Sequence, residues 1–397
     1  MGEVLEKCDL KNFAHQKSRC AALAKDIFRP FAGKWRVVLR KTELRSRESS
    51  ADGIGKDRRR LAFYGRDFSI GISFGLVVDR RSQTAATADA MRHSKIILGT
   101  RGSELARTQS RLVENAIRMA DPDLAIETKI IVTRGDKSKG VDPRAGRKGL
   151  FTAKIERALL AGQVDIAVHS AKDLPSETSP GAKIAAVLPR ASIDDVLVSK
   201  HPGGLASLPH AATVATGSVR RKRQLHWKRT GLNLIDLRGN VPTRLRKLAE
   251  NYWDAIVLAR AGLERLGFSP SHTEISFEGR QFFLEVLPHD SFLPAGGQGI
   301  IALQVRADDQ STNALLQSAN DLETLLCLQA EREFLVRLHG DCNFPVGVHA
   351  TIKNGRMKLH AQLFEGESPT PRQAEVEGAS DEGYQLAAEL LRKIGQD

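Results

Sequence analysis

Cysteine is scarce in this sequence. The 397 residues include four cysteines, which form neither a Cys-x-x-Cys pair nor a Cys and His spacing that suits zinc. This scarcity argues against a disulfide framework and against a structural metal site. No run of apolar residues approaches the ~18–20 residues that a membrane-spanning helix needs. We therefore expect neither a resident metal nor a membrane partner.

Aromatic residues are also few, at 5% of the chain, although the formal net charge of +13 invites a nucleic-acid-binding interpretation. Residues 1–92, however, hold 20 Lys and Arg against 11 Asp and Glu, and the remaining residues hold 40 against 36. Nucleic-acid surfaces combine clustered cations with aromatic stacking platforms. The nearly neutral, aromatic-poor body therefore disfavours a nucleic acid partner, and only an accessory role of the basic segment stays open.

The N-terminal segment 1–92 has no clear hydrophobic period and carries basic runs such as Arg58-Arg59-Arg60. Three interpretations remain open: an organelle transit peptide, a poorly ordered extension, and sequence upstream of a start at Met91. Transit peptides contain few acids, so the 11 acidic residues disfavour the first interpretation. A true leader would place the protein in an organelle, whereas the other two interpretations place it in the cytoplasm.

From Lys95 onward, apolar segments of strand length alternate with amphipathic segments of helix length. This alternation predicts α/β domains with largely parallel sheets, and the hairpin signals of an all-β protein are missing. The expected strands are 95–100, 127–133, 164–170, 212–218, 232–239 and 254–260, and the expected helices are 103–119, 152–161, 220–228 and one from Thr243. A further helix is expected from about Asn320, which we take as its N-cap, to Gly340.

Two Gly-Ser turns follow strands at equivalent places in the two series. Gly102-Ser103 and Gly217-Ser218 each end a strand and open a helix, where unpaired backbone N–H groups favour a carboxylate or phosphate. Serine is also simply a good N-cap, so each turn alone is weak evidence. Together they suggest a ligand held in a cleft between two similar domains.

Arginines gather where α/β domains bind ligands. Five of them fall at predicted strand ends or first helical turns: Arg101, Arg220, Arg221, Arg238 and Arg244. A guanidinium pairs with carboxylates through two hydrogen bonds and stays charged at any relevant pH. The set predicts a polyanionic small molecule, the alternative being scattered salt bridges.

Two further candidates could carry chemistry. Asp173 and Lys172 directly follow a buried strand, where a carboxylate could stabilise a cation and move protons, although Asp-Leu-Pro is also a common turn. Cys342 lies in a Gly- and Pro-containing loop, where a thiol is accessible, although an ordinary loop cysteine is the simpler interpretation. Cys327 falls within the C-terminal helix and is expected to pack in the core.

Many ordered segments resemble the porphobilinogen deaminase (hydroxymethylbilane synthase) family. They cover residues 95–397 and include LGTRGSELARTQS, VTRGDK, KGLF, DIAVHSAKDLP, TGSVRRKRQL, LRGNVPTRL, DAIVLARAGLERLG, LPAGGQGIIALQVR and GDCNFPVGVHA. The resemblance implies two domains like those of periplasmic binding proteins, joined by hinges, and a small α/β C-terminal domain. The implied ranges are 93–188 with 300–317 for domain 1, 194–293 for domain 2, and 322–397 for domain 3.

The resemblance also implies an activity. Members of the family join four porphobilinogen molecules head to tail, release ammonia each time, and then hydrolyse off 1-hydroxymethylbilane for tetrapyrrole synthesis. The chain grows on a dipyrromethane cofactor held by a thioether, which here would attach to Cys342, and the essential aspartate would be Asp173. The implied binding residues are Arg101, Ser103, Lys172, Thr216, Ser218, Arg220, Arg221, Arg238, Arg244, Gln109, Lys148 and Gln298. A monomer is expected, and a non-catalytic carboxylate-binding protein is the main alternative.

Overall fold

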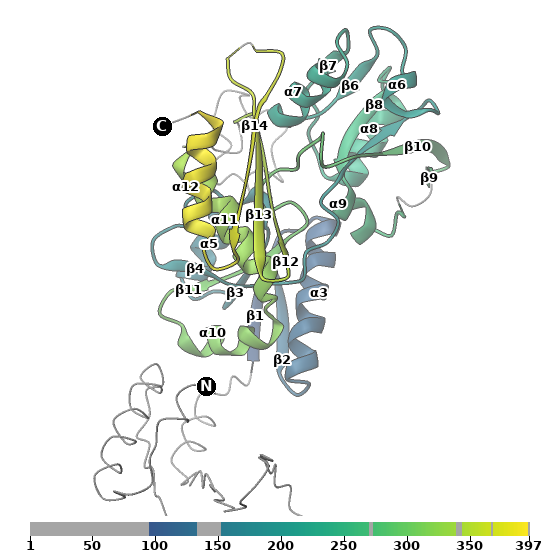
Figure 1. Cartoon of the computed structure of the whole chain (residues 1–397). Coiled ribbons are helices and arrows are strands. Elements are labelled where there is room, and N and C mark those ends of the chain that lie inside the picture. The colour runs from purple at the N-terminus through teal and green to yellow at the C-terminus, as the bar shows by residue number, and fades with distance from the viewer. Residues whose placement is uncertain (1–94, 133–151, 270–272, 339–343, 367, 396–397) are drawn as a thin grey trace, which may run out of the picture. The chain divides into compact units, whose positions relative to one another are not determined.

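The computed structural model describes residues 95–132, 152–269, 273–338, 344–366 and 368–395 (Figure 1). The segment 1–92, Lys148 and Cys342 lie outside the described residues. Among the described residues, none of the helices has the length and apolar character needed to cross a membrane. In the same ranges, His, Cys, Asp and Glu side chains form no group that suits a metal ion.

A five-stranded sheet forms the centre of domain 1. Across the sheet, its strands are β2 (Ala125–Ile130), β1 (Lys95–Thr100), β3 (Ile166–Ser170), β11 (Ile301–Arg306) and β4 (Ala182–Val187). The helices packed against it are α3 (Glu104–Ala120), α5 (Ala153–Leu160) and α10 (Gln310–Leu316), and a short 3-10 turn η2 (Gln317–Ala319) follows α10. Val113 and Ile117, four residues apart on α3, share one core with Ile96 and Leu98 of β1, as the helical period predicts.

Domain 2 repeats this arrangement around a six-stranded sheet. Across the sheet, the strands are β7 (Asn233–Ile235), β6 (Thr213–Ala215), β8 (Ala255–Ala259), β5 (Asp195–Ser199), β10 (Arg280–Leu287) and β9 (Glu274–Phe277). Its helices are α6 (Gly204–Ser207), α7 (Val219–Lys228), α8 (Val241–Glu250) and α9 (Arg260–Arg265). Leu245 and Leu248 of α8 join Ile256 and Leu258 of β8 in the core.

The α/β prediction is confirmed, but the prediction of largely parallel sheets is only partly right. β1 is parallel to β2 and β3, and β6 is parallel to β7 and β8. The remaining pairings are antiparallel, including those of β11 with β3 and of β5 with β8. β5 and β11 follow the two passages of the chain between the domains. Each therefore enters its sheet at the carboxyl ends of the parallel strands and runs against them.

Domain 3 contains a three-stranded antiparallel sheet with two helices. The strands are β12 (Val346–Lys353), β13 (Arg356–Leu363) and β14 (Arg372–Ala379), and the helices are α11 (Leu322–Arg337) and α12 (Gly383–Ile394). Asn354 and Gly355, with φ of 51° and 73°, join β12 to β13 in the two-residue turn that favours hairpins. The expectation that hairpin signals are missing is wrong here, since Asn-Gly is itself the strongest such signal.

Helix α11 begins one residue later than predicted. Its N-cap is Asp321, whose carboxylate accepts a hydrogen bond from the Thr324 N–H at 2.9 Å. Asn320, the predicted cap, instead accepts from the Val187 N–H of β4 at 3.0 Å. Asn320 thus joins domain 3 to the edge of the first sheet. Cys327 is buried in α11 as expected, and burial raises the pKa of its thiol to about 12.

A buried ion pair connects domain 3 to both passages between domains 1 and 2. Glu331 of α11 accepts hydrogen bonds from the Arg190 guanidinium at 2.6 and 3.2 Å. It also accepts from the N–H groups of Gly297 at 2.7 Å and Ala350 at 2.8 Å. The Glu331 side chain has no exposed surface. One carboxylate therefore holds three segments that are distant in sequence.

Glu331→Gln is expected to lower the free energy of unfolding by about 3–5 kcal/mol, because it leaves Arg190 buried without its anion. Unfolding in urea, followed by circular dichroism, measures the change. Glu333→Gln, on the same helix, is the control, since Glu333 is paired with the exposed Arg337 and such pairs contribute about 0–1 kcal/mol. Equal stabilities of the two variants would contradict the prediction.

Candidate functional site

The first part of the site lies where β1 and β3 end. These strands are parallel neighbours, with Leu98 opposite Ile166, so their carboxyl ends share one edge of the sheet. Arg101 and Ser103 follow β1, and the Ser103 hydroxyl caps α3 by accepting from the Ala106 N–H at 3.4 Å. The predicted Gly-Ser helix start is confirmed.

Lys172 and Asp173 follow β3 in a single 3-10 turn, η1 (Ala171–Asp173). Its backbone is fixed from the second passage: the Ala171 N–H donates to the Ile300 carbonyl at 3.0 Å. Gly297, at φ +74°, lies so close that a Cβ there would be 3.0 Å from the backbone of η1. Asp173 itself is exposed. The turn therefore presents its carboxylate to solvent on a rigid support.

Gln109 supports this edge from α3. Its side-chain amide donates to the Ser170 hydroxyl at 2.8 Å, immediately before η1, and its own surface is buried. Gln109 therefore holds the residue that immediately precedes the Lys172–Asp173 turn.

The second part of the site lies at the equivalent edge of domain 2. Thr216 and Ser218 follow β6, and the Ser218 hydroxyl caps α7 by accepting from the Arg221 N–H at 3.4 Å. β7 is the parallel neighbour of β6, with Ala215 opposite Ile235. The loop after β7 carries Arg238 and leads to Arg244 in the first turn of α8, so both arginines lie at this same edge.

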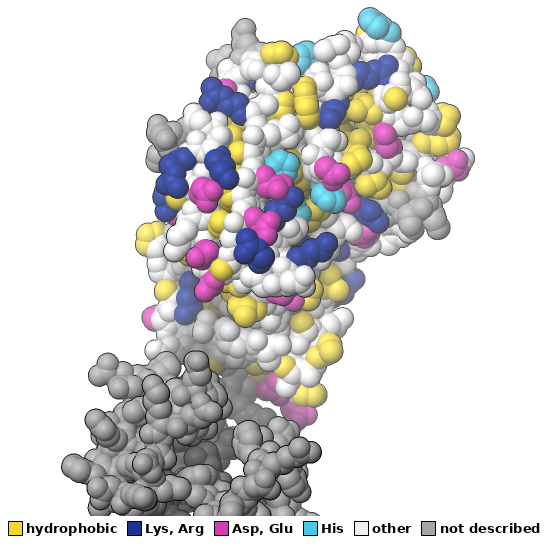
Figure 2. Space-filling model, viewed as in Figure 1, with side chains coloured by type: hydrophobic (Ala, Val, Ile, Leu, Met, Phe, Trp, Pro, Cys, Tyr) yellow, Lys and Arg dark blue, Asp and Glu magenta, His cyan; other side chains and the backbone are white. Residues whose placement is uncertain are grey.

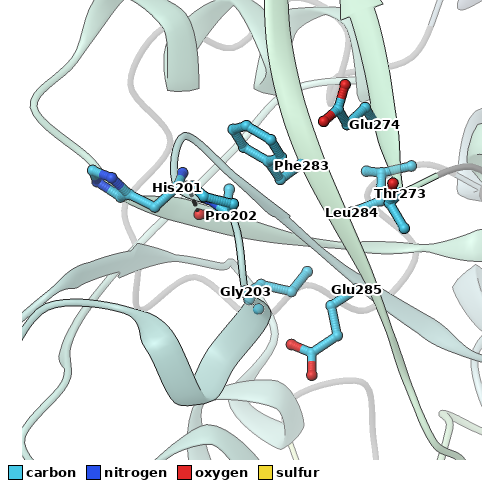
Figure 3. Close-up of a pocket in the computed structure, with 11 residues that line it drawn as sticks. His201, Pro202, Gly203, Thr273, Glu274, Phe283, Leu284 and Glu285 are labelled. Carbon is cyan, nitrogen blue, oxygen red and sulfur yellow. Dashed lines mark hydrogen bonds between the residues drawn. The ribbon is translucent and has the colours of Figure 1, made fainter.

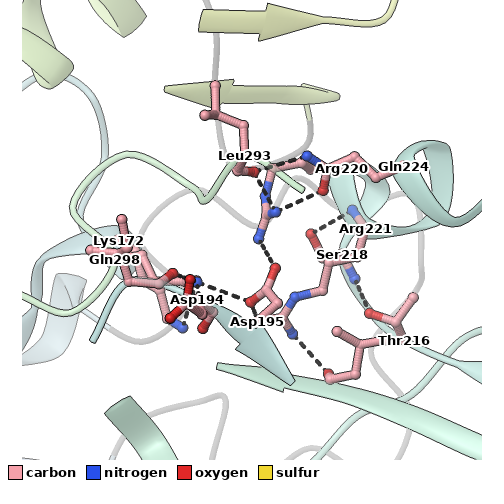
Figure 4. Close-up of polar contacts among 12 residues, drawn as sticks. Lys172, Asp194, Asp195, Thr216, Ser218, Arg220, Arg221, Gln224, Leu293 and Gln298 are labelled. Atoms are coloured by element: carbon pink, nitrogen blue, oxygen red, sulfur yellow. Dashed lines mark hydrogen bonds and ion pairs between the residues drawn. The ribbon is translucent and has the colours of Figure 1, made fainter. Parts of the chain in front are cut away.

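Arg220 and Arg221 converge on one buried acid, Asp195, the first residue of β5 (Figure 4). The Nη2 atom of Arg220 lies 2.8 Å from Oδ2 of Asp195, and Nη2 of Arg221 lies 2.6 Å from Oδ1. All three side chains are almost fully buried. Burial would raise the pKa of Asp195, but the two guanidiniums hold it well below its ordinary range. Asp195 is therefore an anion that keeps two cations in place.

Gln298 links this cluster to domain 1. Its side-chain amide donates to Oδ1 of Asp195 at 2.9 Å and to the Ile193 carbonyl at 2.6 Å. Its carbonyl oxygen accepts from the Lys172 ammonium at 3.4 Å (Figure 4). Gln298 thus brings Lys172 of domain 1 and the paired arginines of domain 2 into one hydrogen-bonded group.

Lys172 lies in an unusual electrostatic environment. Burial, followed by the repulsion of Arg221, lowers the pKa of its ammonium to about 8. We expect acetylation of Lys172 by acetic anhydride to reach half its maximal rate near pH 8, well below the ~10.4 of an ordinary lysine. Peptide mapping across a pH series measures this. Half-maximal labelling near pH 10 would contradict the prediction.

The cluster contains hydrogen-bond donors that no acceptor among the described residues satisfies. Within the described residues, the Nε atoms of Arg220 and Arg221 are buried without a hydrogen-bond acceptor. Arg220 and Arg221 share Asp195 as their counter-ion, so these three side chains together carry a net positive charge. The net positive charge of these three side chains and their unsatisfied donors both fit a ligand rich in carboxylates.

Sequence reasoning missed several residues of this group. Asp195 begins the apolar strand DVLVS. A buried acid in such a strand needs a charged or hydrogen-bonding partner, so the sequence could have predicted that Asp195 is paired. Gln224 and Gln362, described below, carry no local signal. Lys148 and Cys342 lie outside the described residues.

A separate cavity of about 330 Å³ lies in domain 2 beside β5, β9 and β10 (Figure 3). It is lined in part by His201, Glu274 and Glu285, and by none of the predicted site residues. On the face of the molecule seen in Figure 2, basic and acidic side chains are interspersed rather than gathered by sign. The candidate site is therefore identified by the buried ion pairs of Arg220 and Arg221 with Asp195, and it does not coincide with this cavity.

The fold and the site together define an α/β protein with two similar domains and a smaller third one, in which Gln298 links Lys172 to the two arginines paired with Asp195. The family model "Porphobilinogen deaminase, dipyromethane cofactor binding domain" matches residues 96–314, and the model of that family's C-terminal domain matches residues 325–394. The chain belongs to the porphobilinogen deaminase family. It is a transferase, and its cofactor is dipyrromethane.

Individual relatives agree with the family match. The chain is 43% identical to the porphobilinogen deaminase of Syntrophomonas wolfei over 75% of its own length and 95% of that relative. It is also 43% identical to that of Roseiflexus castenholzii, over 77% and 98%. Among solved structures, the methionine-binding protein MetQ matches with 13% identity and a TM-score of 0.38, over 58% of this chain and 92% of that one.

Proposed function

We propose that this chain condenses porphobilinogen head to tail into a linear tetrapyrrole, releases ammonia at each step, and frees 1-hydroxymethylbilane by hydrolysis. The observation that carries the proposal is the group of half-buried Lys172 and buried Arg220 and Arg221, next to the exposed carboxylate of Asp173. Each pyrrole of the substrate bears two carboxylates, so a growing chain accumulates anions in one place. Several fixed cations can hold that charge.

The dipyrromethane cofactor would supply the pyrrole carbon from which the chain grows. We propose that Arg220, Arg221 and Lys172 hold its carboxylates, together with the Ser218 hydroxyl at the start of α7. The guanidinium N–H groups of Arg220 and Arg221 are buried and oriented before any ligand arrives, which reduces the cost of reorganisation. The remaining binding residues from the family resemblance belong to the same proposal: Arg101, Ser103, Thr216, Arg238, Arg244, Gln109, Lys148 and Gln298.

Asp173 has a different task. We propose that its carboxylate stabilises the positive charge that develops on the substrate as ammonia leaves, and that it moves the protons that each condensation releases. Its place on η1, next to Lys172 but exposed, supports this role, because an exposed carboxylate can meet substrate without first breaking a buried ion pair.

We propose Cys342 as the attachment point of the cofactor, and this proposal has a direct test. In cells that make porphobilinogen, the parent chain is expected to show added cofactor mass and Cys342→Ser the bare sequence mass, because a hydroxyl is a far poorer nucleophile than a thiolate. Intact-mass measurement reads out both. Cys327→Ser is the control and should keep the added mass, since Cys327 is buried and its pKa is raised. A parent chain at its bare mass would support the non-catalytic alternative.

We also propose that the enzyme is a monomer that acts in the cytoplasm, with porphobilinogen as its partner molecule and no nucleic acid or membrane partner. The relatives named above are bacterial. Sequencing the N-terminus of the mature protein tests the location: a chain that begins at a residue within 2–90 would indicate a removed organelle leader, whereas a chain that begins at Met91 would indicate a start there.

A further inference from the structure

A chain of side-chain amides runs from Arg220 in domain 2 into domain 3. The Nη1 atom of Arg220 donates to the Gln224 side-chain carbonyl at 2.8 Å, and the Gln224 amide nitrogen donates to the Gln362 carbonyl at 2.6 Å. The Leu293 carbonyl accepts from Arg220 at 2.7 Å and from Gln224 at 2.9 Å (Figure 4). Both glutamines are fully buried.

The direction of this relay is fixed by Arg220. A guanidinium can only donate, so Gln224 must turn its oxygen toward Arg220 and its nitrogen toward Gln362. Gln362 must then present its oxygen, and its own amide nitrogen is left buried without an acceptor among the described residues. An unmade hydrogen bond of this kind costs about 1–3 kcal/mol. Packing alone would favour an apolar side chain at position 362. Gln362 is present there in spite of the unsatisfied amide, and it is hydrogen-bonded to Gln224, the partner of Arg220.

Gln362 also pairs with a strand that begins a few residues after Cys342 in the sequence. It is opposite Gly347 in the β12–β13 pair, and β12 begins at Val346. A Cβ on Gly347 would lie 2.7 Å from the Leu293 carbonyl oxygen, so glycine is what lets this carbonyl reach Arg220 and Gln224. The relay therefore joins Arg220 to the part of domain 3 that directly follows the attachment loop.

Helix α7 contacts the same end of β13 through its next turn. The Trp227 and Phe364 rings meet edge to face with centroids 6.3 Å apart, and the Arg223 guanidinium lies 6.0 Å from the Phe364 centroid. Arg223, Gln224 and Trp227 lie on one face of α7. The helix whose first turn carries the site arginines is thus fixed to domain 3.

We propose that Gln362 is a positioning residue for Arg220, acting through Gln224 from a different domain. The relay holds the guanidinium in the orientation that receives the carboxylates of the cofactor and of the growing chain. This inference rests on the proposed function, in which Arg220 binds those carboxylates. Gln362 itself touches neither substrate nor cofactor.

The test compares two substitutions of matched size. Gln362→Met keeps the volume but loses the acceptor, and Gln362→Glu keeps an acceptor oxygen. We expect Met to reduce the cofactor-loaded fraction of the purified chain, read by intact mass, and to raise KM for porphobilinogen about tenfold, the usual scale for losing a hydrogen bond in such a network. Glu should stay close to the parent in both measurements. Gln373→Met, the exposed neighbour of Gln362 on β14, is the control and should match the parent.

A packing role would give the opposite order, because Met buries more easily than Glu; a Met variant loaded better than the Glu variant would overturn the proposal. Arg220→Leu separates the two levels of inference. If Arg220→Leu lowers loading and Gln362→Met does not, positioning by Gln362 is wrong while the proposed site stands. If Arg220→Leu leaves loading and KM unchanged, the proposed role of Arg220 fails, and the positioning role with it. Should Gln362→Met melt far below the parent, loading and KM are compared at a temperature below its melting point, where the variant is folded.

Discussion

Asp173→Asn is expected to fold normally and to lose turnover by about 10²–10⁴-fold, the usual contribution of a positioned acid or base. Asparagine has nearly the same shape, but it carries no charge to stabilise a cationic substrate and cannot accept a proton. Because Asp173 is exposed at the end of η1, the free energy of unfolding should change by no more than about 0.5 kcal/mol.

The measurement is the rate of ammonia release, together with the intact mass of the purified protein. Glu177→Gln, four residues further along and also exposed, is the control and should retain the parent rate. If Asp173→Asn kept most of the parent activity, Asp173 would only shape the turn before Pro175, the alternative that the sequence left open.

Asp195→Asn is expected to lower the free energy of unfolding by about 3–5 kcal/mol and to weaken cofactor retention. An asparagine can accept from one guanidinium, but its NH₂ group then faces the other, so two buried cations remain without an anion. Lys172 would lose the favourable charge of Asp195 as well. The substitution therefore affects both the arginines of domain 2 and Lys172 of domain 1, which Gln298 connects.

Urea unfolding and intact-mass measurement of the loaded fraction test this prediction. Asp236→Asn, which breaks the exposed pair with Lys222, is the control and should cost about 0–1 kcal/mol. The folded pKa of Asp195 is lowered, so its stabilising contribution is present above the unfolded value of ~3.9 and is lost as pH falls through the folded pKa. A variant as stable as the control would show that the acid is dispensable.

The sequence predicts the local parts of the site well. Ser103 and Ser218 were expected at helix starts, and both cap their helices in the structure. A cap depends on a few neighbouring residues, so a short segment contains the necessary information. The contact between Gln298 and Asp195 spans 103 positions, and no short segment encodes such a partner.

The direction of a strand can likewise be predicted from the sequence where it depends on neighbouring residues, but not where it depends on distant ones. Asn354-Gly355 specifies its own hairpin and could have been predicted from two residues. The antiparallel course of β5 and β11 could not, because it depends on the point at which the chain leaves one domain and enters the other. The start of α11 shows a third case: Asn320 and Asp321 are both good caps, and the pairing of Asn320 with β4 decides between them.

The two passages between domains 1 and 2 leave from adjacent strands, since Asp195 at the start of β5 is opposite Leu287 at the end of β10. Domain 2 is therefore connected to domain 1 by two neighbouring segments. Asp195 and both arginines belong to the same domain, whereas Gln298 reaches Asp195 from the second passage. The two guanidiniums and their acid are therefore one preassembled unit within domain 2, and Lys172 connects to it through a side chain from outside that domain.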